Sequence, residues 1–211
     1  MSSIKLKHSG GNSVIIAAPS SNPASDRTLT LPSNADGTIL TSQSSLDSTK
    51  LSPSITAGIT MVDQWRVSSS FTSNNTDVDS NWERVDTGGF GQIGTGMTQS
   101  SGIFTFPSTG IYRIDFGAAA ARGSADSIRY VNFYIKTTTD NSNYGESSYA
   151  VTNIHNANDV YASAFLCFIF DVTNVSTHKV KFFVQSENSL LWLGNSDQNQ
   201  TYATFTRLGD T

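Results

Sequence analysis

Few side chains in this sequence are of the kinds that carry out acid–base or nucleophilic chemistry. The three histidines are His8 near the N-terminus, His155 in the loop NIHNAND and His178 in the turn STHKV. Nucleophilic catalysis needs a serine or cysteine within reach of such a base. His178 precedes a predicted strand, where a capping or surface role is the simpler interpretation, and only His155 lies in a polar loop beside a carboxylate, Asp159. The histidines therefore do not predict a catalytic site.

Carboxylates and glycines that would bind an ion or a phosphate are also poorly placed. Asp77 and Asp79 lie two positions apart in NNTDVDSN, but the glycine and the distal glutamate of a calcium loop are missing, so a solvated turn is the better interpretation. The glycine-rich stretch FGQIGTG, residues 90–96, is followed by no Lys-Ser/Thr pair. No spacing suggests the paired carboxylates of glycoside cleavage. We therefore predict no metal, no cofactor and no enzymatic activity.

Two polar loops suggest a different chemistry, the binding of sugars. The loops are DNSNYGESSY, residues 140–149, and NSDQNQTY, residues 195–202. Amide side chains give adaptable hydrogen bonds and tyrosine rings give stacking surfaces, which both suit a carbohydrate. The candidate glycan contacts are Tyr144, Tyr149, Asn195 and Asp197. Ordinary loop composition is the alternative interpretation.

The composition narrows the class of protein. A net charge of -4 and a pI near 5.2 argue against nucleic acid as the main partner, because phosphate binding needs clustered Lys and Arg. No segment is apolar for long enough to span a bilayer, and MSSIKLKHSG has no hydrophobic core of a secretory signal. The only cysteine, Cys167, excludes a disulfide framework within the chain. We expect a particle-borne protein made in a host cytoplasm.

The elements that would position any site are short strands. The clearest pattern is FTFPSTGIYRIDF, residues 104–116, which predicts a hairpin of two strands around a Pro-Ser-Thr-Gly turn. Its second strand alternates apolar and polar residues with period two. With these two, at 103–106 and 111–117, the predicted strands of the head are 64–71, 82–85, 103–106, 111–117, 130–137, 149–154, 161–171, 180–185, 190–193 and 202–207. Ten short strands separated by turns predict an all-β sandwich or jelly roll.

Three of these strands are apolar on both faces. The runs are AFLCFIF at 164–170, VKFFV at 180–184 and LLWL at 190–193. In an isolated antiparallel sandwich, one face of each strand should be exposed to solvent. The second apolar face of these strands must therefore be buried against something other than the core. We expect an interface around a threefold axis, formed by Phe165, Cys167, Phe168, Phe170, Phe183 and Trp192; a larger core within one subunit is the alternative.

Residues 1–60 differ from the rest because no aromatic residue occurs before Trp65. Short strands are predicted at 4–7, 14–17, 27–31 and 38–40, separated by turn-rich segments. Such a chain cannot build a core of its own, so we divide the sequence into an extended arm at 1–42, a Ser/Thr-rich linker at 43–60 and a jelly-roll head at 61–211.

The head also carries a family resemblance. The hairpin at 104–116 resembles that of complement-type globular heads, which are relatives of the tumour-necrosis-factor jelly rolls. The longer strings at 59–71 and 82–114 are similar to the C-terminal heads of appendage and fibre-like proteins of tailed phages, especially phages of marine bacteria. IKLKHSGGNSVIIAAPSSNPASDRTLTLP in the arm resembles the module that attaches such proteins to the particle. The resemblance implies a trimeric ten-stranded jelly roll on the surface of a virion.

Together these features predict a phage virion protein, a short fibre, spike or decoration appendage, whose partners are two further copies of itself and, through residues 1–42, other virion proteins. A head that binds a glycan on the host surface is the alternative, and both share the features above. An enzyme such as a depolymerase is the third class, and it lacks an acid–base constellation.

Overall fold

The computed structural model describes residues 3–7, 9–11, 13–17, 58–122, 128–155 and 157–211, and the chain divides into two units, 1–51 and 52–211. In the first unit, β1 (Ser3–Lys7) pairs with β2 (Ser13–Ala17) in antiparallel register. These two strands confirm the predictions at 4–7 and 14–17. The strands predicted at 27–31 and 38–40, and most of the linker, lie outside the described residues.

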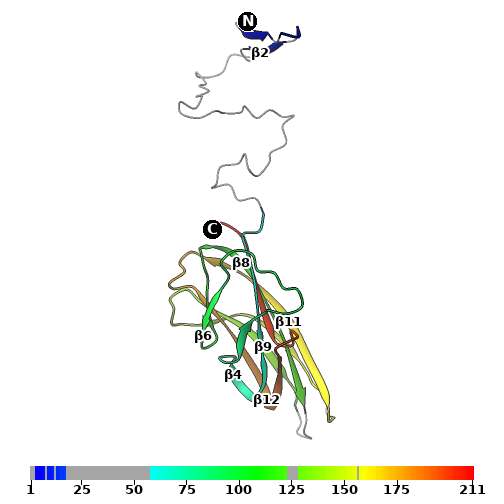
Figure 1. The fold of residues 1–211 in the computed structure, drawn as a ribbon. Helices are drawn as coiled ribbons and strands as arrows, with labels where there is room; N and C mark the ends of the chain where they lie inside the picture. Colours follow the sequence, from blue (N-terminus) through cyan, green and yellow to red (C-terminus); the bar gives the residue numbers. More distant parts are fainter. Residues whose placement is uncertain (1–2, 8, 12, 18–57, 123–127, 156) are drawn as a thin grey trace. The chain divides into compact units, whose positions relative to one another are not determined.

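The second unit is the head, and every regular element described in it is a strand (Figure 1). Among the described residues, its sheet has eleven strands, one more than the resemblance implies. They are β3 (Met61–Val67), β4 (Ser69–Asp77), β5 (Trp82–Arg84), β6 (Thr98–Ser100), β7 (Ile103–Thr105), β8 (Gly110–Arg122), β9 (Val131–Thr138), β10 (Gly145–Thr152), β11 (Val160–Val172), β12 (Lys179–Asn195) and β13 (Tyr202–Gly209). The all-β prediction is confirmed.

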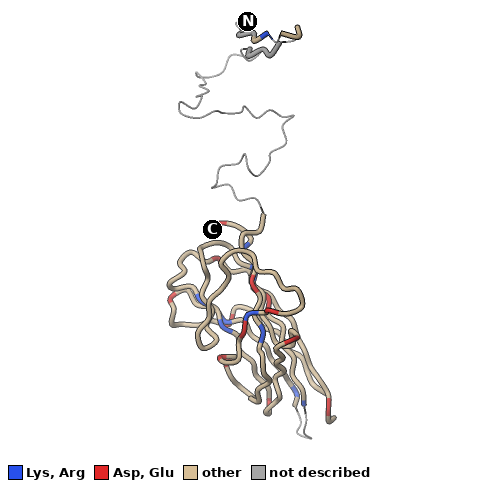
Figure 2. Tube along the Cα trace, viewed as in Figure 1, with Lys and Arg blue, Asp and Glu red and all other residues tan. Residues whose placement is uncertain are grey.

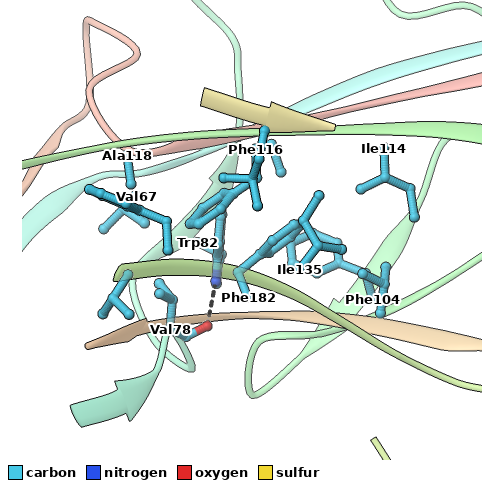
Figure 3. Close-up of a cluster of buried hydrophobic side chains, with 14 of the residues drawn as sticks. Val67, Val78, Trp82, Phe104, Ile114, Phe116, Ala118, Ile135 and Phe182 are labelled. Carbon is cyan, nitrogen blue, oxygen red and sulfur yellow. Dashed lines mark hydrogen bonds between the residues drawn. The ribbon is translucent and has the colours of Figure 1, made fainter. Parts of the chain in front are cut away.

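The sheet curls into two facing layers. One layer has the order β11-β8-β13-β3-β5, and the other has β10-β9-β12, with β4 and β7 also paired to β12. Phe116 of β8 stacks on Phe182 of β12 with ring centroids 4.5 Å apart, so side chains of the two layers meet in a common core (Figure 3). The layers join where Trp192 of β12 pairs with Ala120 of β8. We call them the β8 layer and the β9 layer.

The stretch at 104–116 forms the two predicted strands, but they do not form a hairpin. β7 pairs with β6 and β12, whereas β8 pairs with β11, β13 and the end of β12. Pro107 and the residues after it carry the chain from one layer to the other, and the Tyr112 hydroxyl donates to the Ser108 carbonyl at 2.9 Å. Phe104 and Tyr112 can therefore both face the core from opposite sides. Period-two alternation shows which face is buried but not which strand is the neighbour.

Two further features of the strands differ from the sequence prediction. The strands predicted at 180–185 and 190–193 are one strand, β12, with a register shift between Gln185 and Leu190 against β4. The polar residues between them stay extended, which the composition does not reveal. The short strand β6 was not predicted. Among the residues described, no helix is long and apolar enough to cross a membrane.

Candidate functional site: an exposed apolar strand and a polar cleft

The outer face of β11 carries a row of exposed large apolar side chains. Tyr161, Phe165 and Ile169 point away from the core, with 71%, 55% and 52% of their surface exposed, and Cys167 is exposed between the last two. The alternate residues Ala162, Leu166, Phe170 and Val172 are buried in the core. The prediction that β11 is apolar on both faces is confirmed. We call Tyr161, Phe165, Cys167 and Ile169 the β11 face.

Small residues on the neighbouring strand leave Phe165 and Tyr161 protruding, whereas Cys167 and Ile169 lie opposite the ion-paired Asp115 and Arg113. Phe165 lies opposite Gly117 of β8, and Tyr161 lies opposite Ala121. A Cβ added at Gly117 would lie 2.7 Å from the Tyr202 ring, so glycine lets that ring lie against β8. A shallow depression beside Phe165 is lined by Gly117, Ala119, Ser163 and Tyr202, among others. The face therefore presents aromatic protrusions next to a hollow.

The six residues predicted for the threefold interface fall into different places. Phe165 and Cys167 belong to the β11 face, whereas Phe168 and Phe170 are on the opposite, inward side of the strand. Phe170 is buried, and Phe168 packs partly buried against the core. Residues on one face of a strand must be an even number of positions apart, so the predicted set mixes two faces. Tyr161 and Ile169 have the correct parity and were missed.

Trp192 and Phe183 are both covered within the single chain. Trp192 is fully buried, its ring meets Phe133 edge-on at 5.6 Å, and its Nε1 donates to the Ser73 carbonyl at 3.0 Å. Leu191 is the exposed residue of that run. Phe183 lies on the outer face of the β9 layer, where the Lys136 ammonium sits 3.5 Å from its ring centroid. Neither side chain needs a partner subunit to hide it.

The candidate glycan contacts separate into two regions. Tyr149 lies on the outer face of the β9 layer, where it stacks on Tyr134 with centroids 5.4 Å apart. Tyr144 lies nearby, with the Lys181 ammonium 4.5 Å above its ring. Asn195 is the last residue of β12 and pairs with Ser69 of β4, and Asp197 lies in the turn that follows. The four residues therefore do not form one site.

A polar cleft lies where the turn after β12 meets the loop after β5. It is lined by Gln64, Arg66, Val85, Thr87, Gly88, Gly89, Phe90, Asp197, Gln198 and Asn199. Asn195 Oδ1 accepts hydrogen bonds from the backbone N–H groups of Asp197 and Gln198, at 2.7 and 3.0 Å. Asn195 thus shapes the turn that presents its neighbours to the cleft.

A buried arginine links β5 to the loop after it at the base of this cleft. The Arg66 guanidinium donates to Glu83 Oε1, Asp86 Oδ1 and Thr87 Oγ1 at 2.7–2.8 Å. Burial opposes its charge, but the hydrogen bonds and the attraction of the two carboxylates outweigh burial and raise the pKa of Arg66. A charge that is neutralised locally in this way holds loops in place and offers nothing to an anionic ligand.

The residues able to do acid–base chemistry are not gathered into a centre. His178 is buried, stacks on Phe170 and hydrogen-bonds Thr173 and Thr177, whereas His155 is exposed. Asp77 forms an ion pair with Lys181 at 2.7 Å. Within the described part of the chain, no three His, Cys, Asp or Glu residues are grouped to hold a metal. Acidic and basic positions are interspersed over the head in Figure 2.

Solved structures share this fold at low sequence identity. Murine APRIL at pH 5.0 matches with a TM-score of 0.51 and 15% identity, over 70% of this chain and 98% of that chain. The Eiger TNF from S. frugiperda matches with a TM-score of 0.54 and 10% identity, over 72% of this chain and 94% of that chain. The head is a tumour-necrosis-factor-like jelly roll. This confirms the fold that the resemblance implied for the head. No protein-family model and no curated protein matches the sequence.

Proposed function

We propose that this chain is a structural protein of a phage virion, in which the arm at 1–42 docks on the particle and three copies of the jelly-roll head assemble and are displayed outward. The observation that carries the proposal is the exposed β11 face. Assembly and presentation, with no turnover of a substrate and no cofactor, are the function. The site of action is the particle surface.

The cost of leaving the β11 face in water argues for a covering partner. Burying a large apolar side chain contributes roughly 1.5–3 kcal/mol, and the face exposes Tyr161, Phe165 and Ile169 on one strand. In the described part of the head, β11 pairs only with β8 and ends its layer, so its unpaired backbone edge also favours a partner.

A second copy of the same chain is the occupant that the fold favours. The jelly-roll likeness supports a closed ring, and the trimer that the family resemblance implies would bury the face of each copy against the next. In such a contact the protruding Phe165 of one head packs against a different surface of the next head. Three such contacts close the ring and cover the unpaired edge of β11 in each copy. The shallow depression beside Phe165 supplies a hollow on the same layer.

Two measurements test the proposal separately. The mass of the full chain in solution tests the trimer, and a mass of three chains is expected. Antibody labelling of intact phage particles that encode the chain tests its location, and labelled particles are expected. Particles that carry no label would refute the virion role even if the protein is trimeric.

A head that binds a glycan on the host surface is the second candidate function, and the polar cleft favours it. Three heads on one particle would give avidity, so weak contacts with a sugar would become useful. A glycan array separates this function from a purely structural one. Release of reducing ends from a polysaccharide would instead support a depolymerase.

A further inference from the structure

We infer that the cleft between residues 86–90 and 195–199, named here the Phe90 cleft, binds a neutral sugar residue. The inference deepens the glycan-binding form of the proposed function and rests on it. It assigns the ligand to one of the two regions that hold candidate contacts, and it defines the class of sugar.

The first argument is that the cleft is pre-organised. Thr87 Oγ1 donates to the Asp197 carbonyl at 3.3 Å and accepts from Arg66 at 2.8 Å, which links the two loops through the buried guanidinium. Asn199 Nδ2 donates to Gln64 Oε1 at 2.7 Å, and Gln64 Nε2 donates to Thr204 Oγ1 at 2.7 Å. Each wall is thereby anchored to a strand of the β8 layer. Loops that are already ordered lose less entropy when a ligand binds.

The second argument is the kind of surface that the walls present. Phe90 is half-buried, and the two residues before it are the exposed glycines Gly88 and Gly89, both with left-handed φ angles of 66° and 79°. No side chain from these glycines shields the ring. The facing turn exposes the amide of Gln198 and the carboxylate of Asp197. An aromatic ring opposite hydrogen-bonding side chains suits the apolar face and the hydroxyl edge of a sugar ring.

The third argument is charge, which selects a neutral sugar over an acidic one. Among the described residues that line the cleft, Arg66 is the one basic side chain, and it is buried and already paired with Glu83 and Asp86. Asp197 also lines the cleft and is exposed. A sialic or uronic acid would meet this carboxylate with no unpaired cation among the described lining residues, which is repulsive, whereas hydroxyl groups can donate to it.

The other region is less suited to be the site. On the outer face of the β9 layer, Tyr134 is covered by Tyr149, Phe183 is covered by Lys136, and Lys181 lies over Tyr144. The described aromatic rings on that face contact one another or a lysine, and among them only Tyr149 is largely exposed. Tyr149 therefore serves as the matched aromatic control.

The test is an array of neutral and sialylated oligosaccharides probed with the full-length protein, followed by titration of the best neutral saccharide into variants. We expect wild type to bind neutral sugars only, and Phe90→Ala and Gln198→Ala each to weaken binding at least tenfold. Tyr149→Ala should bind like wild type. The exposed Gln198 keeps the test valid if Phe90→Ala does not fold, and thermal unfolding identifies that case.

Three results would overturn the inference: no binding of any neutral saccharide, preference for sialylated sugars, or binding that survives Gln198→Ala and is lost in Tyr149→Ala. The mass of each sample in solution is measured alongside. A trimer that binds no sugar would refute sugar binding in the Phe90 cleft but would support the trimeric head. A monomer that binds neutral sugar would support the Phe90 cleft but would refute the trimeric head.

Discussion

The two layers of the head treat their outward aromatic side chains differently. On the β9 layer, Phe183 and Tyr134 face outward, and the Lys136 ammonium lies 3.5 Å from the Phe183 centroid and 5.6 Å from the Tyr134 centroid. On the β8 layer, Phe165 and Tyr161 face outward with no such cover in the described part of the chain and remain mostly exposed. Phe183 and Tyr134 are therefore covered by their own chain, and of the described aromatic side chains on that face only Tyr149, which is 58% exposed and stacks on Tyr134, resembles the uncovered Phe165 and Tyr161 of the β8 layer.

This difference teaches how to interpret a strand that is apolar on both faces. A lysine stem can lie along an aromatic ring while its charged end stays hydrated, so an outward phenylalanine does not by itself require a partner. On the strand next to the β11 face, Phe165 and Tyr161 lie opposite Gly117 and Ala121, and the arginine there, Arg113, lies opposite Ile169 and is ion-paired with Asp115. The proposed second subunit is therefore argued from Phe165 and its neighbours and not from Phe183.

The largest effect is expected at the boundary between the core and the outer face of β12. Phe182 is fully buried and contacts Phe116, Trp82 and Phe104, so Phe182→Ala should lower the free energy of unfolding by about 3–5 kcal/mol. The adjacent Phe183→Ala should cost about 1 kcal/mol. Chemical denaturation of both variants measures the two values. Equal losses would contradict the assignment of Phe183 to a surface that its own chain covers.

The second effect concerns association. Replacing Phe165 and Ile169 together by aspartate should weaken self-association at least about 100-fold, equivalent to about 2.7 kcal/mol, because charges would face an apolar contact. The double variant should keep the β-sheet circular dichroism signal of the wild type, since both side chains are exposed in the single chain. Sedimentation over a range of concentrations gives the comparison, with Phe183→Ala as the control that should remain associated.

The third prediction tests how much the Lys136 side chain stabilises the head by lying over the Phe183 ring. Lys136→Ala removes both the stem and the charge from the Phe183 ring and should destabilise the head by about 0.5–1 kcal/mol. Lys136→Met keeps most of the stem, so it should recover the part that is due to packing. If Lys136→Ala leaves the thermal midpoint unchanged, the cover is not a stabilising contact and the contrast between the layers weakens.

The smallest effect is in the loop that joins β9 and β10. Hydrogen bonds from Asn143, Ser142 and Thr138 hold the pKa of Asp140 well below its usual range. A lowered pKa in the folded state means that the carboxylate stabilises the fold above its ordinary pKa, about 3.9, and that this stabilisation is lost as the pH falls further. Asp140→Ala should therefore unfold at a lower temperature than wild type at pH 7, and the gap should shrink toward pH 2. A gap that does not change with pH would contradict this role.

The fold class could be predicted from the sequence because alternation with period two is a local property. Tyr112, Ile114 and Phe116 were predicted to face one way, and all three are buried. The pairing of β7 with β12 depends on how the sheet curls, which no local pattern records. For the same reason Trp192 was assigned to an interface, although it is fully buried within the single chain against Phe133.

The candidate site was less predictable than the fold. Parity along β11 would have selected Tyr161 and Ile169 with Phe165 and would have excluded Phe168 and Phe170. The cleft joins residues that are more than 100 positions apart in sequence, such as Thr87 and Asp197, so only the folded chain brings them together. Asn195 and Asp197 were proposed as glycan contacts from loop composition alone and stay predictions, whereas Phe90 and Gln198 carried no signal that set them apart from ordinary loop residues.

The mass of the full-length protein in dilute solution, measured by sedimentation equilibrium, tests the need for partner subunits most directly. The account predicts a species of three 22.7 kDa chains that persists on dilution and is lost when Phe165 and Ile169 become aspartate. A stable wild-type species with the mass of one chain, whose β11 face stays in water without aggregation, would contradict it.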